Sequence, residues 1–215
     1  MKFHFTPFLA AASLFANGGL SAPALSDDVR EAHSAIEPRQ EGVGVSVTAS
    51  VSVYIALQSC YTQVRNHTGA INQTVNGVGG TGASWLQQNG AIQAVRYELN
   101  LIGQILAATT QQLSVVGGNI GSDINGLVAI LLQIVCEIVY TLQNVAVQVG
   151  PAVVVILGII INNVVTLLAG LLLGVEALAH GSLRLVWDGV NGVSGTFNAA
   201  ISPIVKALGY LLGLQ

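Results

Sequence analysis

The chain has 215 residues, of which 52% are hydrophobic and only 8% are charged, whereas about a quarter of the residues in an average soluble domain are charged. This composition excludes intrinsic disorder, which requires low hydrophobicity and high charge. Seven Lys and Arg residues, a net charge of -3 and the lack of a basic cluster exclude nucleic acid as a partner, because the phosphates would not be neutralised. The 25 glycines follow no collagen repeat.

The N-terminal residues have the features of a secretory signal peptide. Lys2 precedes an apolar run, residues 3–15, that is too short to span a bilayer. The sequence Ala-Pro-Ala at 22–24 fits the small-x-small pattern of a signal cleavage site. We therefore expect residues 1–24 to be removed after Ala24. The alternative is a buried N-terminal helix, which the Asn-Gly-Gly sequence at 17–19 disfavours.

Residues 25–39 differ from the rest of the chain because they hold six of its charged side chains. We interpret this stretch as a pro-segment. Its last residues, Pro38-Arg39 before Gln40, resemble the sites at which kexin-type proteases process secreted fungal proteins. Cleavage after Arg39 would make Gln40 the first residue of the mature chain. The alternative is an exposed charged tail that stays attached.

The start of the mature chain fits two structures. Apolar residues alternate with small polar residues over 43–57, which is typical of a strand. Val47, Val51 and Tyr54 also share one face of a helix, and no second strand is found for pairing. We favour a helix over about 45–66 and keep the strand as the alternative.

Two features in the first half agree with secretion. Asn66 and Asn72 each begin an Asn-x-Thr triplet, which is an acceptor for N-glycosylation and would place residues 66–74 on the surface. Cys60 and Cys136 are the only cysteines, and a single pair in an oxidising compartment is expected to form a disulfide. Its long loop would contribute about 4 kcal/mol to stability. The alternative is two buried free thiols.

Two amphipathic helices are predicted in the middle of the chain. Apolar residues spaced three and four apart define one helical stripe over 92–113 and a second over 124–149. Gly117-Gly118 separates the two helices. Ser122 is a suitable N-cap for the second helix, and Asp123 would lie in its first turn, where the helix dipole favours a negative charge.

The last third of the chain is the most apolar. Gly150-Pro151 interrupts the pattern, and Pro151 is well placed to open the next helix. That helix, about 152–178, is apolar nearly all round. We expect a line of small and polar side chains on it to allow close helix packing: Gly158, Asn162, Thr166, Gly170 and Gly174. A final helical region over 183–213 contains several glycines and a proline, so we expect it to be broken.

These elements predict an all-α fold. We expect residues 40–215 to form a single helical domain, a bundle of about five helices, with a polar first half (40–120) and an apolar second half (121–215). The stretch 152–175 also satisfies the hydropathy of a membrane span. We favour the core of a bundle, because Asn162-Asn163 lies at its centre and the preceding helix carries a polar stripe.

No catalytic, cofactor-binding or metal-binding site is predicted. His67 and His180 are the histidines of the mature chain, too few for a zinc site. Glu98 and Glu137 could form a pair of catalytic carboxylates, but both fall on polar helix faces, where we expect them to be solvated. The sequence therefore predicts no enzyme and no cofactor.

The overall layout is a signal peptide, a polar first half rich in Gln, Asn and Thr, and an apolar second half almost without charge. It resembles a family of small secreted proteins of basidiomycete fungi that accumulate in the hyphal wall alongside hydrophobins. The resemblance implies an extracellular protein that supports surface attachment and aerial growth. The eight cysteines of hydrophobins are absent, so the chain is not a hydrophobin.

Two classes of function follow. The first is a secreted, interface-active protein of the cell wall, with self-association, wall polysaccharide and apolar interfaces as its partners. Its apolar helices would pack together in solution and reorganise at a surface. The alternative is a membrane-active toxin or effector that inserts a hairpin of 124–149 and 152–175. A weaker third option is a carrier that binds small apolar ligands in the bundle core.

Overall fold

The structure is a computed structural model that describes residues 41–79, 84–116 and 124–214, with only the backbone described over 41–51. All of the described helices belong to one compact unit, Gln40–Gln215. The predicted cleavage sites at Ala24 and Arg39 lie outside the described residues. So do the predicted cap residues Ser122 and Asp123.

The polar first half forms two long helices. Helix α2 spans Glu41–Val78, so the helix predicted over 45–66 is confirmed and the strand alternative is wrong. Helix α3 spans Trp85–Ser114 and begins earlier than predicted. Its start is fixed by a capping box, in which the Ser84 hydroxyl accepts from the Gln87 N–H and the Gln87 side chain accepts from the Ser84 N–H.

The apolar second half contains one correction to the predicted helices. Helix α4, Ile124–Gln148, matches the predicted 124–149. Gly150 then adopts a φ of +109°, and Pro151 caps a short helix α5, Ala152–Ile156. The helix predicted over 152–178 is interrupted at Leu157, where ψ is 0°, and continues as α6, Gly158–Leu178. Glycine has the lowest helix propensity after proline, so a break before Gly158 costs little.

The last region is broken, as its glycines and Pro203 predict. Helix α7, Ser182–Val193, runs into a short 3₁₀ helix η3, Ser194–Thr196, and α8 spans Ser202–Leu211. Pro203 is accepted because it lies in the first turn of α8, where its missing N–H has no intrahelical partner to lose. The described residues thus form seven α-helices rather than about five, and the all-α fold class is confirmed.

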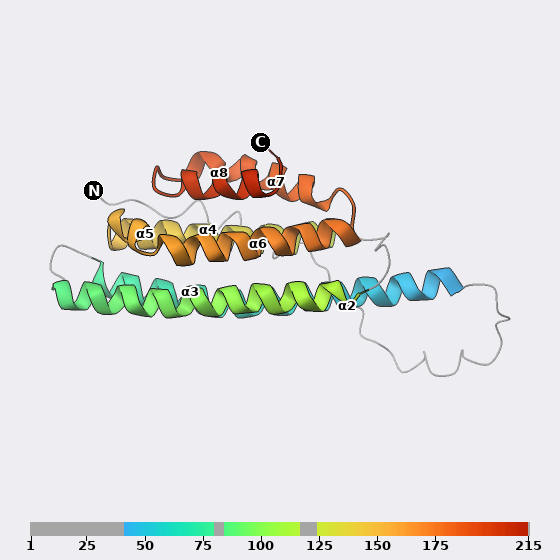
Figure 1. Ribbon diagram of the computed structural model, residues 1–215, viewed down its shortest axis with the longest axis horizontal. Helices are drawn as coiled ribbons and strands as arrows, with labels where there is room; N and C mark the ends of the chain where they lie inside the picture. The colour runs from blue at the N-terminus through green and yellow to red at the C-terminus, as the bar shows by residue number, and fades with distance from the viewer. Residues whose placement is uncertain (1–40, 80–83, 117–123, 215) are drawn as a thin grey trace, which may run out of the picture. The chain divides into compact units, whose positions relative to one another are not determined.

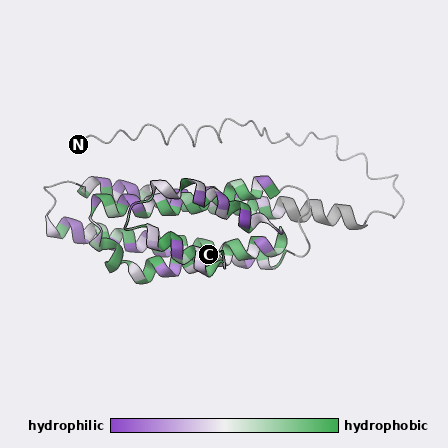
Figure 2. Ribbon diagram, turned by 90° about the horizontal axis from the view of Figure 1, so that it is seen from above, coloured by the Kyte–Doolittle hydropathy of each residue, from purple (hydrophilic) through white to green (hydrophobic). Residues whose placement is uncertain are grey.

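The helices of Gln40–Gln215 pack at three levels (Figure 1). Helices α2 and α3 pair with each other, α4 packs on α2, α6 packs on α3, and α7 and α8 cover α4 and α6. Two hydrogen bonds between α2 and α4, Thr68 to Glu137 and Asn72 to Thr141, each join residues that are 69 positions apart in the sequence. A constant offset means that these two helices run parallel. Hydrophobic and hydrophilic residues alternate along the helices (Figure 2).

One hydrophobic core extends through all of these helices. Its largest fully buried side chains are all leucine or isoleucine and come from α2, α3, α4 and the α5–α6 break: Leu57, Ile71, Leu99, Ile102, Leu106, Leu113, Leu131, Ile134, Ile138, Leu142 and Leu157. At roughly 1.5–3 kcal/mol for each fully buried aliphatic side chain, this burial is the main favourable term in folding.

The line of small residues predicted on α6 is not the contact that brings helices together. A Cβ atom at Gly158 or Gly170 would meet no neighbour within 4 Å, and Asn162 and Thr166 are exposed. Gly174 alone of this line faces α3, and a Cβ there would make only an ordinary contact, 3.9 Å from Thr110 Cγ2. The close approach between α3 and α6 lies at Gly103 instead, where a Cβ would be 3.3 Å from Leu167 Cδ1. The glycine that allows close packing therefore belongs to α3, and α6 contributes the large side chain of Leu167 to this contact.

Candidate functional site

Two carboxylates join helix α2 to its neighbours α3 and α4. The Glu98 side chain of α3 lies 2.6 Å from His67 Nδ1 on α2, and the Glu137 carboxylate of α4 accepts a 2.7 Å hydrogen bond from the Thr68 hydroxyl. Thr68 is fully buried, with 0% of its surface exposed. The prediction that both glutamates are solvated is therefore wrong, because adjacent residues of α2 hold them at interhelical contacts.

A ladder of amides and hydroxyls continues this contact along α2 and α4. The Asn72 amide donates to the Thr141 hydroxyl at 3.5 Å, and its carbonyl oxygen accepts from Asn144 at 2.8 Å. Asn144 also donates to Asn76, and Gln148 donates to Asn144. The predicted glycan at Asn72 conflicts with this arrangement, because the amide nitrogen that would carry it lies inside the ladder.

The predicted surface stretch 66–74 is part of α2 and contains fully buried residues, Thr68 and Ile71. Asn66 itself is exposed, so glycosylation at this position stays a prediction. Its triplet partner Thr68 is committed to Glu137 in the folded protein. The threonine of this Asn-x-Thr triplet is thus a residue that packs α2 against α4, and the triplet by itself does not indicate this role.

The predicted disulfide between Cys60 and Cys136 is not formed, and both are free thiols. The register explains this result. At the 69-residue offset between α2 and α4, Cys136 lies level with residue 67, seven residues from Cys60. That separation is about 10 Å along a helix axis, whereas disulfide cysteines need Cα atoms within about 7 Å. Cys60 instead hydrogen-bonds Thr109 on α3.

The turn between α6 and α7 is organised by one carboxylate. Glu176 accepts hydrogen bonds from the backbone N–H groups of Gly181 and Leu183, at 2.9 and 2.7 Å, and from the Ser182 hydroxyl at 3.2 Å. Burial alone would raise the pKa of Glu176, but these hydrogen bonds and His180 together lower it. The Ser182–His180 neighbourhood is therefore a helix-capping turn.

Six of the fourteen exposed large apolar side chains of the described residues lie at one end of the bundle. The start of α3 and helix α5 lie at this end (Figure 1). Val155 and Ile159 are 82% and 84% exposed. No Asp, Glu, Lys or Arg occurs over residues 66–95 or 138–175, the segments that build it. We call this surface the uncharged end; it comprises Trp85, Leu86, Val147, Val155, Ile156 and Ile159.

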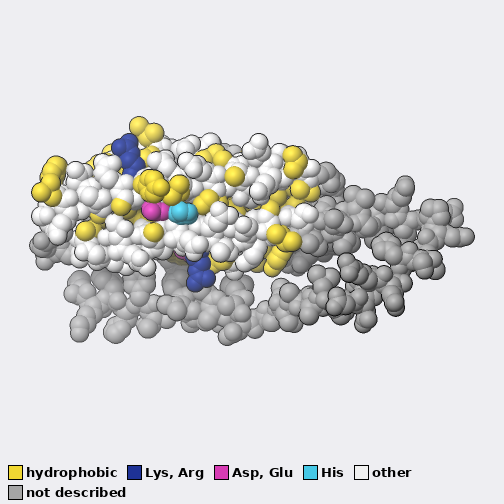
Figure 3. Space-filling model, turned by 90° about the horizontal axis from the view of Figure 1, so that it is seen from below, with side chains coloured by type: hydrophobic (Ala, Val, Ile, Leu, Met, Phe, Trp, Pro, Cys, Tyr) yellow, Lys and Arg dark blue, Asp and Glu magenta, His cyan; other side chains and the backbone are white. Residues whose placement is uncertain are grey.

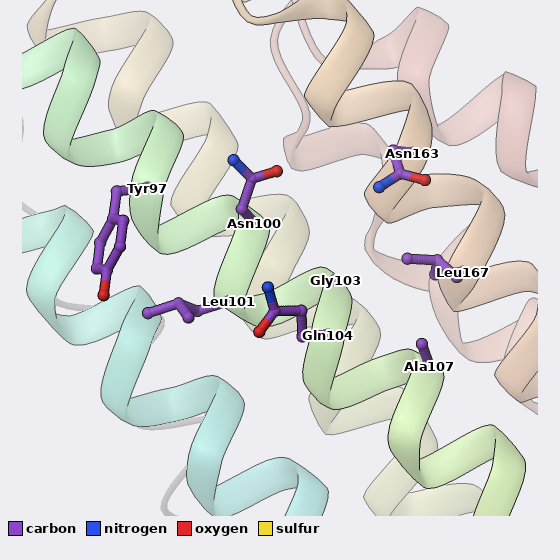
Figure 4. A pocket seen from close by; sticks show the side chains of 8 residues that line it. All are labelled: Tyr97, Asn100, Leu101, Gly103, Gln104, Ala107, Asn163 and Leu167. Atoms are coloured by element: carbon purple, nitrogen blue, oxygen red, sulfur yellow. The ribbon is translucent and has the colours of Figure 1, made fainter.

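A second surface feature is a groove of about 440 Å³ between α3 and α6. Figure 4 shows that most of the labelled residues come from α3 and that Asn163 and Leu167 come from α6. The full lining is Tyr97, Asn100, Leu101, Gly103, Gln104, Ala107, Asn163 and Leu167. The lining therefore combines polar and apolar groups and contains no ionisable residue except the tyrosine.

The remaining surface shows little charge. On the face shown in Figure 3, only a few charged side chains lie among apolar and uncharged polar ones. Within the described ranges, no three His, Cys, Asp or Glu residues gather in a way that could hold a metal ion. Two described helices, α4 and α6, are long and apolar enough to cross a membrane by length and composition, and about half of each is buried in the bundle.

Comparison with known proteins identifies no relative. No family model, no curated protein and no solved structure matches the chain.

Proposed function

We propose that the protein is a secreted, interface-active structural protein of the cell wall, which adsorbs to apolar surfaces and associates with further copies of itself. The observation that carries this proposal is the uncharged end, where six large apolar side chains are exposed and the segments around them hold no formal charge. A solvated protein surface of this kind is typical of an interaction site.

Energetics favour adsorption through this end. Each large aliphatic side chain that leaves water contributes about 1.5–3 kcal/mol. A charged residue on the same surface would make adsorption less favourable, because an unpaired charge loses its hydration when it leaves water. The uncharged end carries no such residue, whereas α7 and α8 carry Arg184, Asp188 and Lys206. The layout of the chain, which resembles that of fungal wall proteins, supports the same assignment.

Surface tension measured on a pendant drop tests the proposal. We expect the purified protein to lower the tension of water, and the double variant Val155→Gln/Ile159→Gln to lower it less and more slowly. The matched control is Leu185→Gln/Leu211→Gln, which removes two exposed leucines from α7 and α8 and should behave like the parent protein. An unchanged tension with the parent protein would overturn the proposal.

The alternative function is a membrane-active protein that inserts a hairpin of α4 and α6. The observation that favours it is the length and hydropathy of these two helices. Against it, α4 carries Glu137, Thr141 and Asn144 in hydrogen bonds to α2, and insertion would break these bonds in a medium without water.

Dye release from phosphatidylcholine vesicles distinguishes the two functions. The hairpin function requires leakage, together with loss of the α2–α4 contacts. The interface function predicts adsorption to the vesicle surface without leakage. Rapid release of dye at low protein concentration would favour the alternative, whereas intact vesicles combined with lowered surface tension would favour the first proposal.

A further inference from the structure

The groove between α3 and α6 contains three side-chain amides that have no protein partner. Asn100, Gln104 and Asn163 line it, and none of them makes a side-chain hydrogen bond within the part of the chain that the structure describes. The amides between α2 and α4 behave differently, because Asn72 and Asn144 bond one another. All three groove amides are exposed, so their donors and acceptors face solvent and can bond a ligand that displaces water.

The chemistry of the lining selects a class of ligand. Each carboxamide offers both donors and an acceptor, which matches a hydroxyl group that also donates and accepts. Leu101, Ala107 and Leu167 add apolar contact, and Tyr97, which is 62% exposed, adds an amphipathic aromatic ring. No lining residue carries a formal charge, so nothing in the groove pairs with an anion or a cation. The volume of about 440 Å³ lies in the range of small-molecule sites.

A second groove of about 500 Å³ repeats this chemistry on α2. Tyr61, Gln58, Thr62 and Asn66 line it, together with the single cation Arg65. The contacts of His67 with Glu98 and of Cys60 with Thr109 show that α2 and α3 run antiparallel. This register brings residues 58–69 of α2 level with the part of α3 that lines the first groove. Gln58, Thr62 and Asn66 lie on the side of α2 away from Cys60 and His67, however, so this second groove faces away from α3.

We propose that the α3–α6 groove binds a neutral saccharide, with Asn100, Gln104 and Asn163 contacting its hydroxyl groups and Tyr97 contacting a sugar ring. The α2 groove faces another side of the hairpin, so the proposal concerns the α3–α6 groove alone. The groove shares no residue with the uncharged end. The proposal therefore stands or falls independently of the surface activity proposed above.

Isothermal titration of the purified protein with cellohexaose, laminarihexaose and chitohexaose tests this binding, with hexagalacturonate as an anionic comparison. We expect at least one neutral hexasaccharide to bind and hexagalacturonate not to bind. The double variant Asn100→Leu/Gln104→Leu should weaken binding about thirtyfold, because it removes two hydrogen bonds of about 1 kcal/mol each. Asn163→Leu should also weaken it, because α6 forms the second wall.

The matched control is Gln93→Leu/Gln111→Leu, which changes two exposed amides of α3 outside the groove and should bind like the parent protein. Circular dichroism checks that every variant is folded. Failure of all three neutral hexasaccharides to bind would overturn the proposal, as would equal loss of binding in the control. Surface tension measured on the Asn100→Leu/Gln104→Leu variant should be unchanged, which separates this result from the test of surface activity.

Discussion

Thr68 has a structural role that its local sequence does not indicate. In the sequence it completes an Asn-x-Thr triplet, and in the fold it is fully buried and donates to Glu137 of α4. His67, the neighbouring residue, contacts Glu98 of α3. Successive residues of a helix point about 100° apart, so two neighbours can serve two different partner helices. This pair fixes the register of α2 against both.

Replacement of Thr68 by valine tests the contact with Glu137. Valine keeps the shape but removes the hydroxyl, so the Glu137 carboxylate loses a donor in a half-buried position. We expect the free energy of unfolding in urea to fall by about 1–2 kcal/mol. Thr62→Val is the control, because the Thr62 hydroxyl is exposed and bonds only to Gln58 of its own helix. Equal losses in both variants would show that the interhelical bond contributes nothing.

Cys136 gives a second prediction at the residue scale. Burial, with a smaller contribution from the Glu137 charge, raises the pKa of its thiol from 9.0 to about 11. The Cys136 thiol is therefore still protonated in the folded protein at a pH at which it is already ionised in the unfolded chain. The stability from this group is complete below pH 9 and is lost as the pH rises toward 11, by about 2 kcal/mol.

Urea unfolding at a series of alkaline pH values measures this loss, and Cys136→Ala should reduce the slope. Dithiothreitol should leave the unfolding midpoint at pH 7 unchanged, because neither cysteine is in a disulfide. A midpoint that falls on reduction would mean that Cys60 and Cys136 do pair, which contradicts the register of α2 and α4.

At the scale of elements, most of the helices follow from the spacing of apolar residues. The stripe over 124–149 corresponds to α4 almost residue for residue. The start of α3 lies earlier than its apolar stripe, because the capping box at Ser84 and Gln87 fixes it, and that signal was readable in the sequence. The break at Leu157 was not predicted, because a run of Val, Ile and Leu supports a continuous helix and a single glycine such as Gly158 does not by itself end one.

Glu176 tests how the α6–α7 turn is held. Its carboxylate accepts three hydrogen bonds from residues 181–183, and its pKa is lower than the ordinary 4.5. A lowered pKa in the folded state means that the stability it provides is present above pH 4.5 and is lost as the pH falls below it. We expect Glu176→Ala to lower the free energy of unfolding at pH 7 by about 1–2 kcal/mol.

Urea unfolding at pH 7 and at pH 3.5 checks this. The difference between the parent protein and Glu176→Ala should shrink at the lower pH, because the stability that the carboxylate provides is lost progressively as the pH falls below 4.5. Asp188→Asn, at an exposed position of α7, serves as the control and should change little at either pH. A Glu176→Ala penalty that is the same at both pH values would contradict the role of the charged carboxylate.

At the scale of the whole molecule, the fold class could be predicted but the interfaces could not. Periodicity shows that a helix has an apolar face, yet it does not show which helix covers that face. The parallel pairing of α2 with α4 depends on long-range contacts such as Asn72 to Thr141. The same register makes a Cys60–Cys136 bond impossible. The groove amides Asn100 and Gln104 look like ordinary polar-face residues until α6 is placed beside them.

The proposed function rests on adsorption by the folded bundle through its uncharged end. Infrared reflection spectroscopy of the protein film at an air–water surface tests this most directly, because it reports both secondary structure and the tilt of helices. We predict a helical amide band like that in solution, with the long helices tilted away from the plane of the surface, and loss of this tilt in Val155→Gln/Ile159→Gln. A film of flat-lying helices, or one converted to β-structure, would contradict the account.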